Sequence, residues 1–486
     1  MQCLLSALLL AGASGVLANV NYPPIPSDKT TPVQQRLAFK SPTEMSVGWN
    51  TYEQLSNACV QYGTSQTALK SKACSDSSVT YPTSRTWSNA VTLTGLKPAT
   101  QYYYKIVSGN STVSQFVSPR LAGDTTPFNV SLVIDLGVYG DNGYTTTKRE
   151  EIPAIQPALQ HTTIGALART INNYEFVIHP GDFAYADDWI KTLSDLLNGK
   201  NAYEAILENF YDQLAPVAGV KAYMASPGNH EADCQEIPYT SRLCPTGQKN
   251  FTDFQNRFGR TMPSTFPSQS TSKSLQANAK KAAALANPPF WFSFEYGMAH
   301  VVMFDTETDF KNAPDGTNGS AHLDTGRFGF PGQQTAFLRA DLASVNRTQT
   351  PWLIVAGHRP WYALGDEQCG PCQNAFETIF YQAGVDLAIF GHVHNSQRFA
   401  PMYQGKVDPA GYNNPKAPAY IIAGGAGNIE GLSTYSSNAT GNVFAYDEDF
   451  SYATLQFKDS EHLGIQFLRS STGELLDSSV LYKKRG

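Results

Sequence analysis

Five short apolar segments in the second part of the chain each end in polar side chains that could bind a metal ion. They lead, in order, to Asp135-Leu136-Gly137, Gly181-Asp182-Phe183-Ala184-Tyr185, Gly228-Asn229-His230-Glu231, Gly357-His358 and Gly391-His392-Val393-His394. Carboxylate, amide, phenol and imidazole groups are suitable ligands for divalent and trivalent first-row metal ions. Glycine stands beside nearly every one of these residues and allows a sharp turn with close backbone approach.

The apolar segments before these motifs are predicted to be buried strands of an α/β sheet. Ligands of such sheets gather where the strands end, so the five motifs are expected to lie together. Each motif alone is a weak signal, although His392 and His394 alternate on an extended segment and therefore point the same way. Five such motifs in order, each behind a strand, predict a metal site.

Segments with the spacing of helices separate these strands. Apolar residues recur at helical spacing in residues 164–171, 203–214 and 376–383, with Thr162 and Thr163 as candidate caps of the first and Gly384 after the last. Strands that alternate with helices indicate an α/β fold. Residues 268–289, which are rich in Ser, Ala and Lys, are predicted to be a solvated insertion.

The first part of the chain has the pattern of an all-β domain. Residues 44–49 and 101–106 alternate as strands do. Gly95–Thr100, before the second of them, resembles the turn and tyrosine corner of a fibronectin type III β-sandwich. The predicted fold class is therefore α/β, preceded by an all-β fibronectin type III-like domain.

Together the five motifs resemble those of the calcineurin-like metallophosphoesterases. More narrowly, they are similar to the purple acid phosphatases of the secreted, high-molecular-weight plant and fungal type, through Tyr185 in Gly-Asp-x-x-Tyr, the Gly228–Glu231 motif and Trp189. This resemblance implies an αββα sandwich. We expect a signal peptide at residues 1–18, the β-sandwich at 19–124, the metallophosphoesterase domain at 125–434 and a C-terminal segment at 435–486 packing on that domain.

The resemblance also implies a binuclear centre of Fe(III) and a divalent ion, which would be zinc, manganese or iron. The ferric ligands would be Asp135, Tyr185 and His394, the divalent ligands Asn229, His358 and His392, and Asp182 would bridge the two ions. A bridging carboxylate can hold two ions at the separation used in two-metal catalysis. A phenolate is a hard anionic donor and favours the trivalent ion.

The implied activity is that of an acid phosphatase that hydrolyses small phosphate monoesters and releases inorganic phosphate. A metal-activated hydroxide would attack in line. Asp182 and His230 would be catalytic, and Asn229 and His230 would contact the substrate. His230 would protonate the leaving alkoxide, the alternative being a turn histidine bonded to backbone, and Glu231 would act with it or orient it.

The sequence departs from plant relatives in the loop after the fourth motif. Those relatives carry further substrate-contacting histidines there, whereas residues 359–372 contain none. Tyr362, Asp366 and Glu367 are candidate replacements. His161, His179, His300, His322 and His462 are expected to be structural or at the surface.

Two other functions compete with this interpretation, and a third reaction could accompany it. A phosphodiesterase or nucleotide hydrolase of the same superfamily is disfavoured by Tyr185, which most such relatives lack. A non-catalytic extracellular binding protein is disfavoured because every expected ligand is present. Redox chemistry at the iron would be a side activity.

Composition excludes some partners. The 486 residues include 35 Lys and Arg against 41 Asp and Glu, a net charge of −6, which argues against an electrostatic nucleic-acid or membrane binder. The apolar run near the N-terminus ends in Val16-Leu17-Ala18 and is too short to span a membrane. It predicts a signal peptide and a secreted, extracellular protein without a membrane partner.

Glycosylation and disulfides are expected in that compartment. Sequons occur at Asn110, Asn129, Asn250, Asn318, Asn346 and Asn438. Asn129 leads into an apolar run, which would bury it and leave it unmodified. Six cysteines follow the signal peptide and allow 15 connectivities, of which sequence proximity favours Cys59–Cys74, Cys234–Cys244 and Cys369–Cys372.

Overall fold

The computed structural model describes residues 20, 22–139, 162–191, 199–234, 244–266, 270–321, 323–435 and 438–485. The predicted signal peptide lies outside these residues, as do His161 and His322. Within these ranges, no helix is both long and apolar enough to cross a lipid bilayer.

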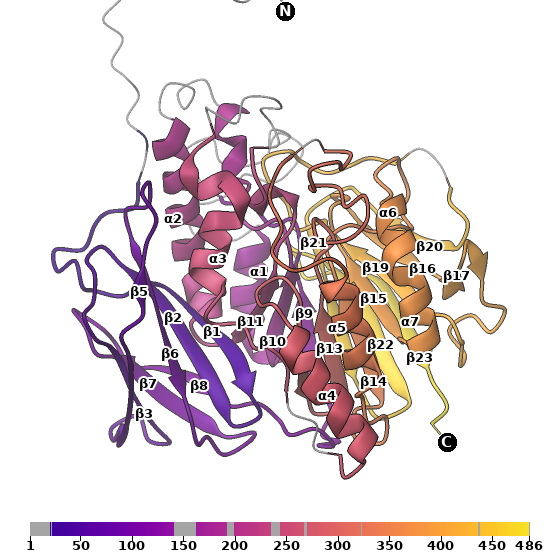
Figure 1. Ribbon diagram of the computed structural model, residues 1–486, viewed down its shortest axis with the longest axis horizontal. Helices are drawn as coiled ribbons and strands as arrows, with labels where there is room; N and C mark the ends of the chain where they lie inside the picture. Colours follow the sequence, from indigo (N-terminus) through magenta and orange to yellow (C-terminus); the bar gives the residue numbers. More distant parts are fainter. Residues whose placement is uncertain are drawn as a thin grey trace, which may run out of the picture.

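A ten-stranded sheet runs through the molecule in the order β23-β22-β21-β9-β10-β11-β1-β2-β6-β5 (Figure 1). Its strands are β1 (Val33–Ser41), β2 (Glu44–Thr51), β5 (Ser78–Val79), β6 (Trp87–Leu93), β9 (Phe128–Leu132), β10 (Phe176–Pro180), β11 (Ala222–Ser226), β21 (Ser451–Phe457), β22 (His462–Arg469) and β23 (Leu475–Tyr482). Because β9, β10 and β11 are parallel, the first three motifs leave the sheet at one edge.

A seven-stranded sheet has the order β12-β13-β14-β15-β19-β16-β20. Its strands are β12 (Phe292–Tyr296), β13 (Ala299–Met303), β14 (Trp352–Ala356), β15 (Leu387–Phe390), β16 (Ser396–Phe399), β19 (Ala419–Ala423) and β20 (Asn442–Tyr446), and β17 (Met402–Tyr403) and β18 (Lys406–Val407) form a separate hairpin. Strands β13, β14, β15 and β19 are parallel, so the last two motifs also leave at one edge.

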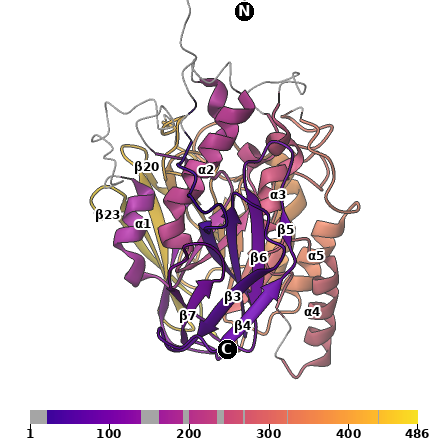
Figure 2. The same ribbon diagram turned by 90° about the vertical axis from the view of Figure 1, so that its left-hand side faces the viewer.

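The two sheets pack face to face over an aromatic core. Phe176 of β10 lies with its ring 5.7 Å from that of Phe294 of β12, and Phe128 of β9 lies 5.0 Å from Tyr296. The helices are α1 (Thr163–Arg169), α2 (Gly199–Ala218), α3 (Thr252–Phe258), α4 (Lys273–Leu285), α5 (Gln333–Leu342), α6 (Gly370–Cys372) and α7 (Thr378–Ala383). Figure 2 shows α1 and the α4–α5 pair on opposite sides of the strands. The predicted αββα sandwich is confirmed.

The helix signals in the sequence correspond to α1, α2 and α7. The Thr162 hydroxyl caps α1 by accepting a hydrogen bond of 3.0 Å from the amide of Gly165, and Gly384 ends α7 with a φ of +69°. Part of the predicted solvated insertion forms α4, of which only Ala279 and Ala282 are buried. This helix therefore lies on the surface, as its composition indicates.

The N-terminal part is all-β, as predicted. A four-stranded sheet, β4-β3-β7-β8, accompanies β1, β2, β5 and β6; its strands are β3 (Ala58–Gly63), β4 (Ser71–Ser75), β7 (Gln101–Ile106) and β8 (Ser114–Val117). The phenol of Tyr102 accepts a hydrogen bond of 3.0 Å from the amide of Lys97, which is the contact of a tyrosine corner.

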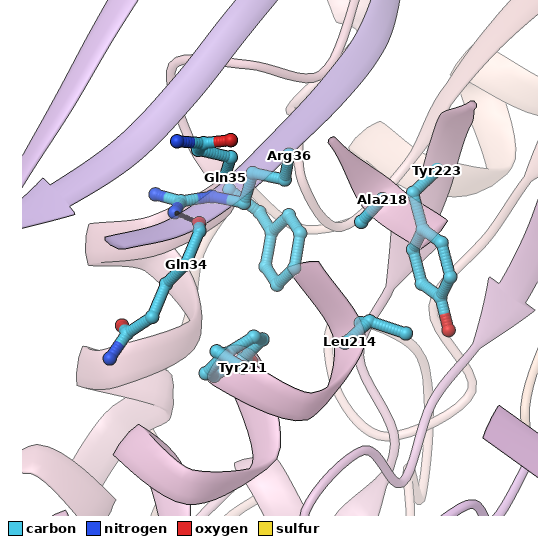
Figure 3. A pocket seen from close by; sticks show the side chains of 8 residues that line it. Gln34, Gln35, Arg36, Tyr211, Leu214, Ala218 and Tyr223 are labelled. Atoms are coloured by element: carbon cyan, nitrogen blue, oxygen red, sulfur yellow. Dashed lines mark hydrogen bonds between the residues drawn. The ribbon is translucent and has the colours of Figure 1, made fainter. Parts of the chain in front are cut away.

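This N-terminal part is joined by backbone pairing to the strands that precede the first three motifs. Strand β1 pairs in parallel with β11, Leu37 opposite Ala222. The buried guanidinium of Arg36 donates to the carbonyl of Arg257 at 3.0 Å and to Asn50 at 2.9 Å. Figure 3 shows Arg36 beside a small pocket whose other side is lined by Tyr211 and Leu214 of α2.

The C-terminal segment extends the same sheet. Strand β21 pairs antiparallel with β9, from Ala453 opposite Leu132 to Phe457 opposite Phe128. The rings of Phe128 and Phe457 stack with centroids 4.5 Å apart. The segment therefore forms hydrogen bonds to the strand that precedes Asp135.

The cysteines form the three pairs that sequence proximity favours, Cys59–Cys74, Cys234–Cys244 and Cys369–Cys372. Among the predicted glycosylation sites, Asn110, Asn250, Asn318 and Asn438 are exposed, whereas Asn129 and Asn346 are half-buried. The Asn129 side chain also donates 3.0 Å to the carbonyl of Asn173. Modification at the other five positions stays a prediction, as does the absence of modification at Asn129.

Candidate metal centre

The fold brings all seven predicted metal ligands together. Strands β9, β10 and β11 lead to Asp135, Asp182 and Asn229, while β14 and β15 lead to His358 and His392. Tyr185 follows Asp182 in the loop after β10, and His394 follows His392 in the loop after β15. Asp135, Asp182 and His358 are fully buried, with 0% of their surface exposed. Charged side chains buried to this degree need a partner of opposite charge.

One carboxylate belongs to two groups of potential ligands. Asp182, His358 and His392 form the first group, and Asp135, Asp182 and His394 form the second, with ligand atoms of each group within 4.8 Å of one another. Asp182 Oδ2 lies 2.9 Å from His358 Nε2. The arrangement provides two adjacent sites that share Asp182.

The two remaining predicted ligands each lie at one of these groups. The Tyr185 hydroxyl is 2.7 Å from His394 Nε2 and 3.2 Å from Asp135 Oδ1. Asn229 Oδ1 is 3.0 Å from His358 Nε2. The phenol therefore adjoins the Asp135 group and the amide adjoins the His358 group.

The electrostatics of Asp135, His392 and His394 fit bound cations. Burial raises the pKa of Asp135 well above its ordinary value, because nothing around it compensates fully for lost solvation. Burial lowers the pKa of His394 to about 4 and that of His392 well below its ordinary value. Neutral imidazoles have lone pairs that can bind a metal ion, and a buried carboxylate needs a positive charge beside it. Bound metal ions would meet both requirements.

His230 is held beside the two groups by a carboxylate of its own. Its Nδ1 lies 2.8 Å from both carboxylate oxygens of Asp187, and its Nε2 lies 3.8 Å from Asp182 Oδ2 and 4.0 Å from Glu430 Oε2. Burial opposes protonation of His230, but Asp187 and Asp182 outweigh it and raise its pKa well above the ordinary value. The ring is therefore held by Asp187 with Nε2 towards the site.

The carboxylate of Glu231 accepts hydrogen bonds from backbone amides. Its Oε2 accepts hydrogen bonds of 2.9 Å from the amides of Asp182 and Gly228, and its Oε1 accepts one of 2.9 Å from Phe183. These three bonds join the second and third motifs. The carboxylate is thus placed to orient Asp182 rather than to act on a substrate.

Comparison with known proteins gives a consistent result over the whole chain. Family models match for the N-terminal domain of purple acid phosphatases at residues 32–120, for calcineurin-like phosphoesterases at 137–396 and for an iron/zinc purple acid phosphatase-like C-terminal region at 417–478. Acid phosphatase A of Cryphonectria parasitica is 63% identical over 97% of this chain and 95% of its own. The chain belongs to the purple acid phosphatase family.

More distant relatives agree with this membership. An acid phosphatase of Aspergillus ficuum is 28% identical over 90% of this chain and 82% of its own. A purple acid phosphatase from yellow lupin seeds has the same fold, with a TM-score of 0.64 at 21% identity, over 94% of this chain and 75% of its own. As a member of this family, the chain is a metallophosphoesterase of the acid phosphatase class.

Four residues of this purple acid phosphatase that sequence reasoning missed border the ligands. Arg359 lies directly after His358, Glu307 follows β13, Asp187 lies two residues after Tyr185, and Glu430 lies 3.8 Å from His394. Glu307 had a signal of the same kind as the five motifs, because Asp305-Thr306-Glu307 also follows a buried parallel strand. No local signal distinguishes the other three.

The candidate replacements for the missing histidines divide into two kinds. The Tyr362 hydroxyl hydrogen-bonds to Glu377 and accepts from the amide of Gly405 at 2.9 Å, so it is engaged with other loops. Asp366 and Glu367 are exposed residues of the same loop.

Proposed function

We propose that this purple acid phosphatase hydrolyses phosphate monoesters at a centre of Fe(III) and one divalent ion, which is zinc, manganese or iron. Asp135, Tyr185 and His394 would hold the ferric ion, Asn229, His358 and His392 the divalent ion, and Asp182 both. The observation that carries the proposal is that Asp182 belongs to both groups of ligands. When bound, the two ions would neutralise charge on the phosphoryl oxygens and activate a water molecule.

The side chains of the protein would hold the substrate and move one proton. Asn229 and His230 would contact the phosphate. Asp187 holds the Nδ1 side of His230, so the proton on Nε2 would pass to the leaving alkoxide oxygen. Glu231 would keep Asp182 in place through its backbone hydrogen bonds.

The proposal includes secretion and inorganic phosphate as product. Three disulfides support an oxidising compartment, where such bonds persist. The substrates would be small phosphate monoesters, with neither a nucleic acid nor a membrane as partner, in line with the acidic composition.

A visible absorption spectrum of the purified, unreduced protein tests the metal assignment. We expect a broad visible band, because charge transfer from the Tyr185 phenolate to ferric iron absorbs visible light. Tyr185→Phe should remove the band while iron stays bound through the remaining ligands. A colourless wild-type protein with both metals bound would contradict the ferric assignment.

Substrate class needs a separate comparison. One relative, from Hordeum vulgare, is named nucleotide pyrophosphatase/phosphodiesterase and is 27% identical over 71% of this chain. We expect an aryl phosphate monoester to be hydrolysed faster than the corresponding bis-aryl diester. The reverse order would favour a phosphodiesterase.

A further inference from the structure

Arg359 is anchored next to the predicted divalent-metal ligands. Its Nε donates to Glu307 Oε2 at 2.6 Å. The hydroxyl of Thr306 accepts hydrogen bonds from the amides of both His358 and Arg359, at 3.2 Å and 2.9 Å. The side chain is largely buried, with 11% of it exposed. The Arg359 side chain is thus held in place directly after His358, a predicted ligand.

The other end of the guanidinium is bonded to a second predicted ligand. Its Nη1 lies 2.9 Å from His392 Nε2. Arginine can only donate, so Nε2 must provide the lone pair in this hydrogen bond. A neutral imidazole has one such lone pair, and its other ring nitrogen carries the proton.

A metal ion held by His392 would therefore break this hydrogen bond. With the ion on Nε2, the lone pair that accepts from Nη1 would be used by the metal. With the ion on Nδ1, the ring proton would be on Nε2, which could no longer accept from Nη1. Either way, Nη1 would lose its partner in the filled site.

Nη2 is buried and lies beside a carboxylate. Within the part of the chain that the structure describes it makes no hydrogen bond, and it forms an ion pair with Asp315 Oδ1 at 3.5 Å. Because Glu307 pairs with Nε and Asp315 with Nη2, Nη1 is the nitrogen left to face the predicted ligands. A charged guanidinium N–H group at this position can bind a phosphoryl oxygen.

We propose that Arg359 is a phosphate-binding residue of this enzyme. Once the metals are bound, its guanidinium would no longer bond to His392 and would bind phosphoryl oxygens instead. The inference rests on the proposed two-metal site. It also accounts for the loop at residues 359–372, which contains no histidine. Unlike a histidine, an arginine keeps its charge at every pH at which the protein is folded.

Calorimetric titration with inorganic phosphate tests this proposal on metal-loaded and metal-free protein. In the metal-loaded form, Arg359→Met should raise the Kd for phosphate about 10- to 100-fold, as expected for the loss of hydrogen bonds to a charged group. Arg359→Lys should be intermediate, because it keeps the charge without the planar fork. In the metal-free form, the wild type and Arg359→Met should bind phosphate equally weakly. Arg339→Met, at an exposed position of α5, is the matched control and should bind like the wild type.

Metal content, measured on the same samples, separates binding from positioning. If Arg359 only positions His392, Arg359→Met will lose metal, while the sites that remain loaded bind phosphate with the wild-type Kd. That result would overturn the proposal. So would a wild-type Kd for phosphate in Arg359→Met and Arg359→Lys at full metal occupancy. Failure of the metal-loaded wild type to bind phosphate would instead contradict the proposed function itself.

Discussion

Four predicted ligands have the left-handed backbone conformation, which residues other than glycine rarely adopt. Their φ angles are +61° at Asp135, +57° at Asp182, +51° at Tyr185 and +67° at His392. Such residues cost free energy and persist only where surrounding structure holds them. Here the chain must turn sharply at the end of each strand, so that the ligand faces its neighbours instead of continuing along the strand.

Close approach of backbone to ligand is most severe at Gly228. A Cβ atom at this position would lie 2.3 Å from Asp182 Oδ1 and 2.9 Å from His358 Cγ. Even one methyl group would therefore displace the carboxylate shared by the two groups. Only glycine fits this position without moving a ligand.

We accordingly expect Gly228→Ala to release metal and to lower kcat/KM by at least about 100-fold. Displacing a metal ligand should cost at least as much activity as removing a residue that hydrogen-bonds to such a ligand. The comparison is Gly370→Ala, where a Cβ atom would meet nothing within 4 Å. Metal content and phosphatase activity of the two variants decide the point. Wild-type metal content in Gly228→Ala would show that the ligands tolerate the displacement.

At the scale of elements, α2 joins the catalytic domain to the N-terminal domain through buried carboxyl groups. Glu204 of α2 accepts hydrogen bonds from Tyr81 at 2.7 Å and from Thr83 at 2.8 Å. Tyr81 also lies 2.9 Å from Asp253 Oδ1 of α3. Burial, and then the charge of Asp253, raise the pKa of Glu204 to about 8.

This raised pKa has a consequence for stability. Glu204 is protonated in the folded protein at neutral pH but ionises at its ordinary pKa of 4.5 in the unfolded chain. Its contribution to stability is therefore complete below about pH 4.5 and is lost as pH rises towards 8. We expect the Tm to fall by a few degrees over this range.

Glu204→Gln should reduce that fall, because the amide does not ionise. Thermal unfolding from pH 5 to pH 8 measures the effect, with Glu53→Gln at an exposed position as the control. An identical slope of Tm against pH in Glu204→Gln and the wild type would rule out this origin of the pH dependence.

The two terminal parts of the chain are built into the catalytic fold at the scale of the whole molecule. Strand β1 continues the sheet on one side of β9–β11, and β21 continues it on the other. Buried Arg36 and Tyr81 bond across the N-terminal junction. The domain boundaries near residues 124 and 434 stay predictions, but neither marks a gap in hydrogen bonding.

We therefore predict one cooperative unfolding transition rather than a separate one for each domain. Differential scanning calorimetry of the intact protein checks this. Tyr81→Phe should shift the whole transition to lower temperature, because it removes the hydroxyl that bonds to Glu204 and Asp253 across the junction. Two resolved transitions, of which only one moves in Tyr81→Phe, would show that the N-terminal domain unfolds independently.

The sequence by itself indicated the fold class and the five motifs at strand ends, and its resemblance to the purple acid phosphatases selected the seven candidate ligands among them. Strand and helix periods are local patterns, and ligands at strand ends must converge because parallel strands end at one edge of a sheet. For that reason Asp135, Asp182 and His358 could be selected without knowing any contact between them. The tyrosine corner at Tyr102 was likewise readable from a short segment.

Only the tertiary structure decided which other groups complete the site. Asp187 meets His230 across 43 residues, and Glu307 meets Arg359 across 52. It also decided that β1 and β21 extend one sheet. Contacts of this kind depend on how loops and sheets pack in three dimensions, and charged residues such as these occur in many loops where they bind nothing. Their roles follow from the close approach of elements that no local pattern in the chain records.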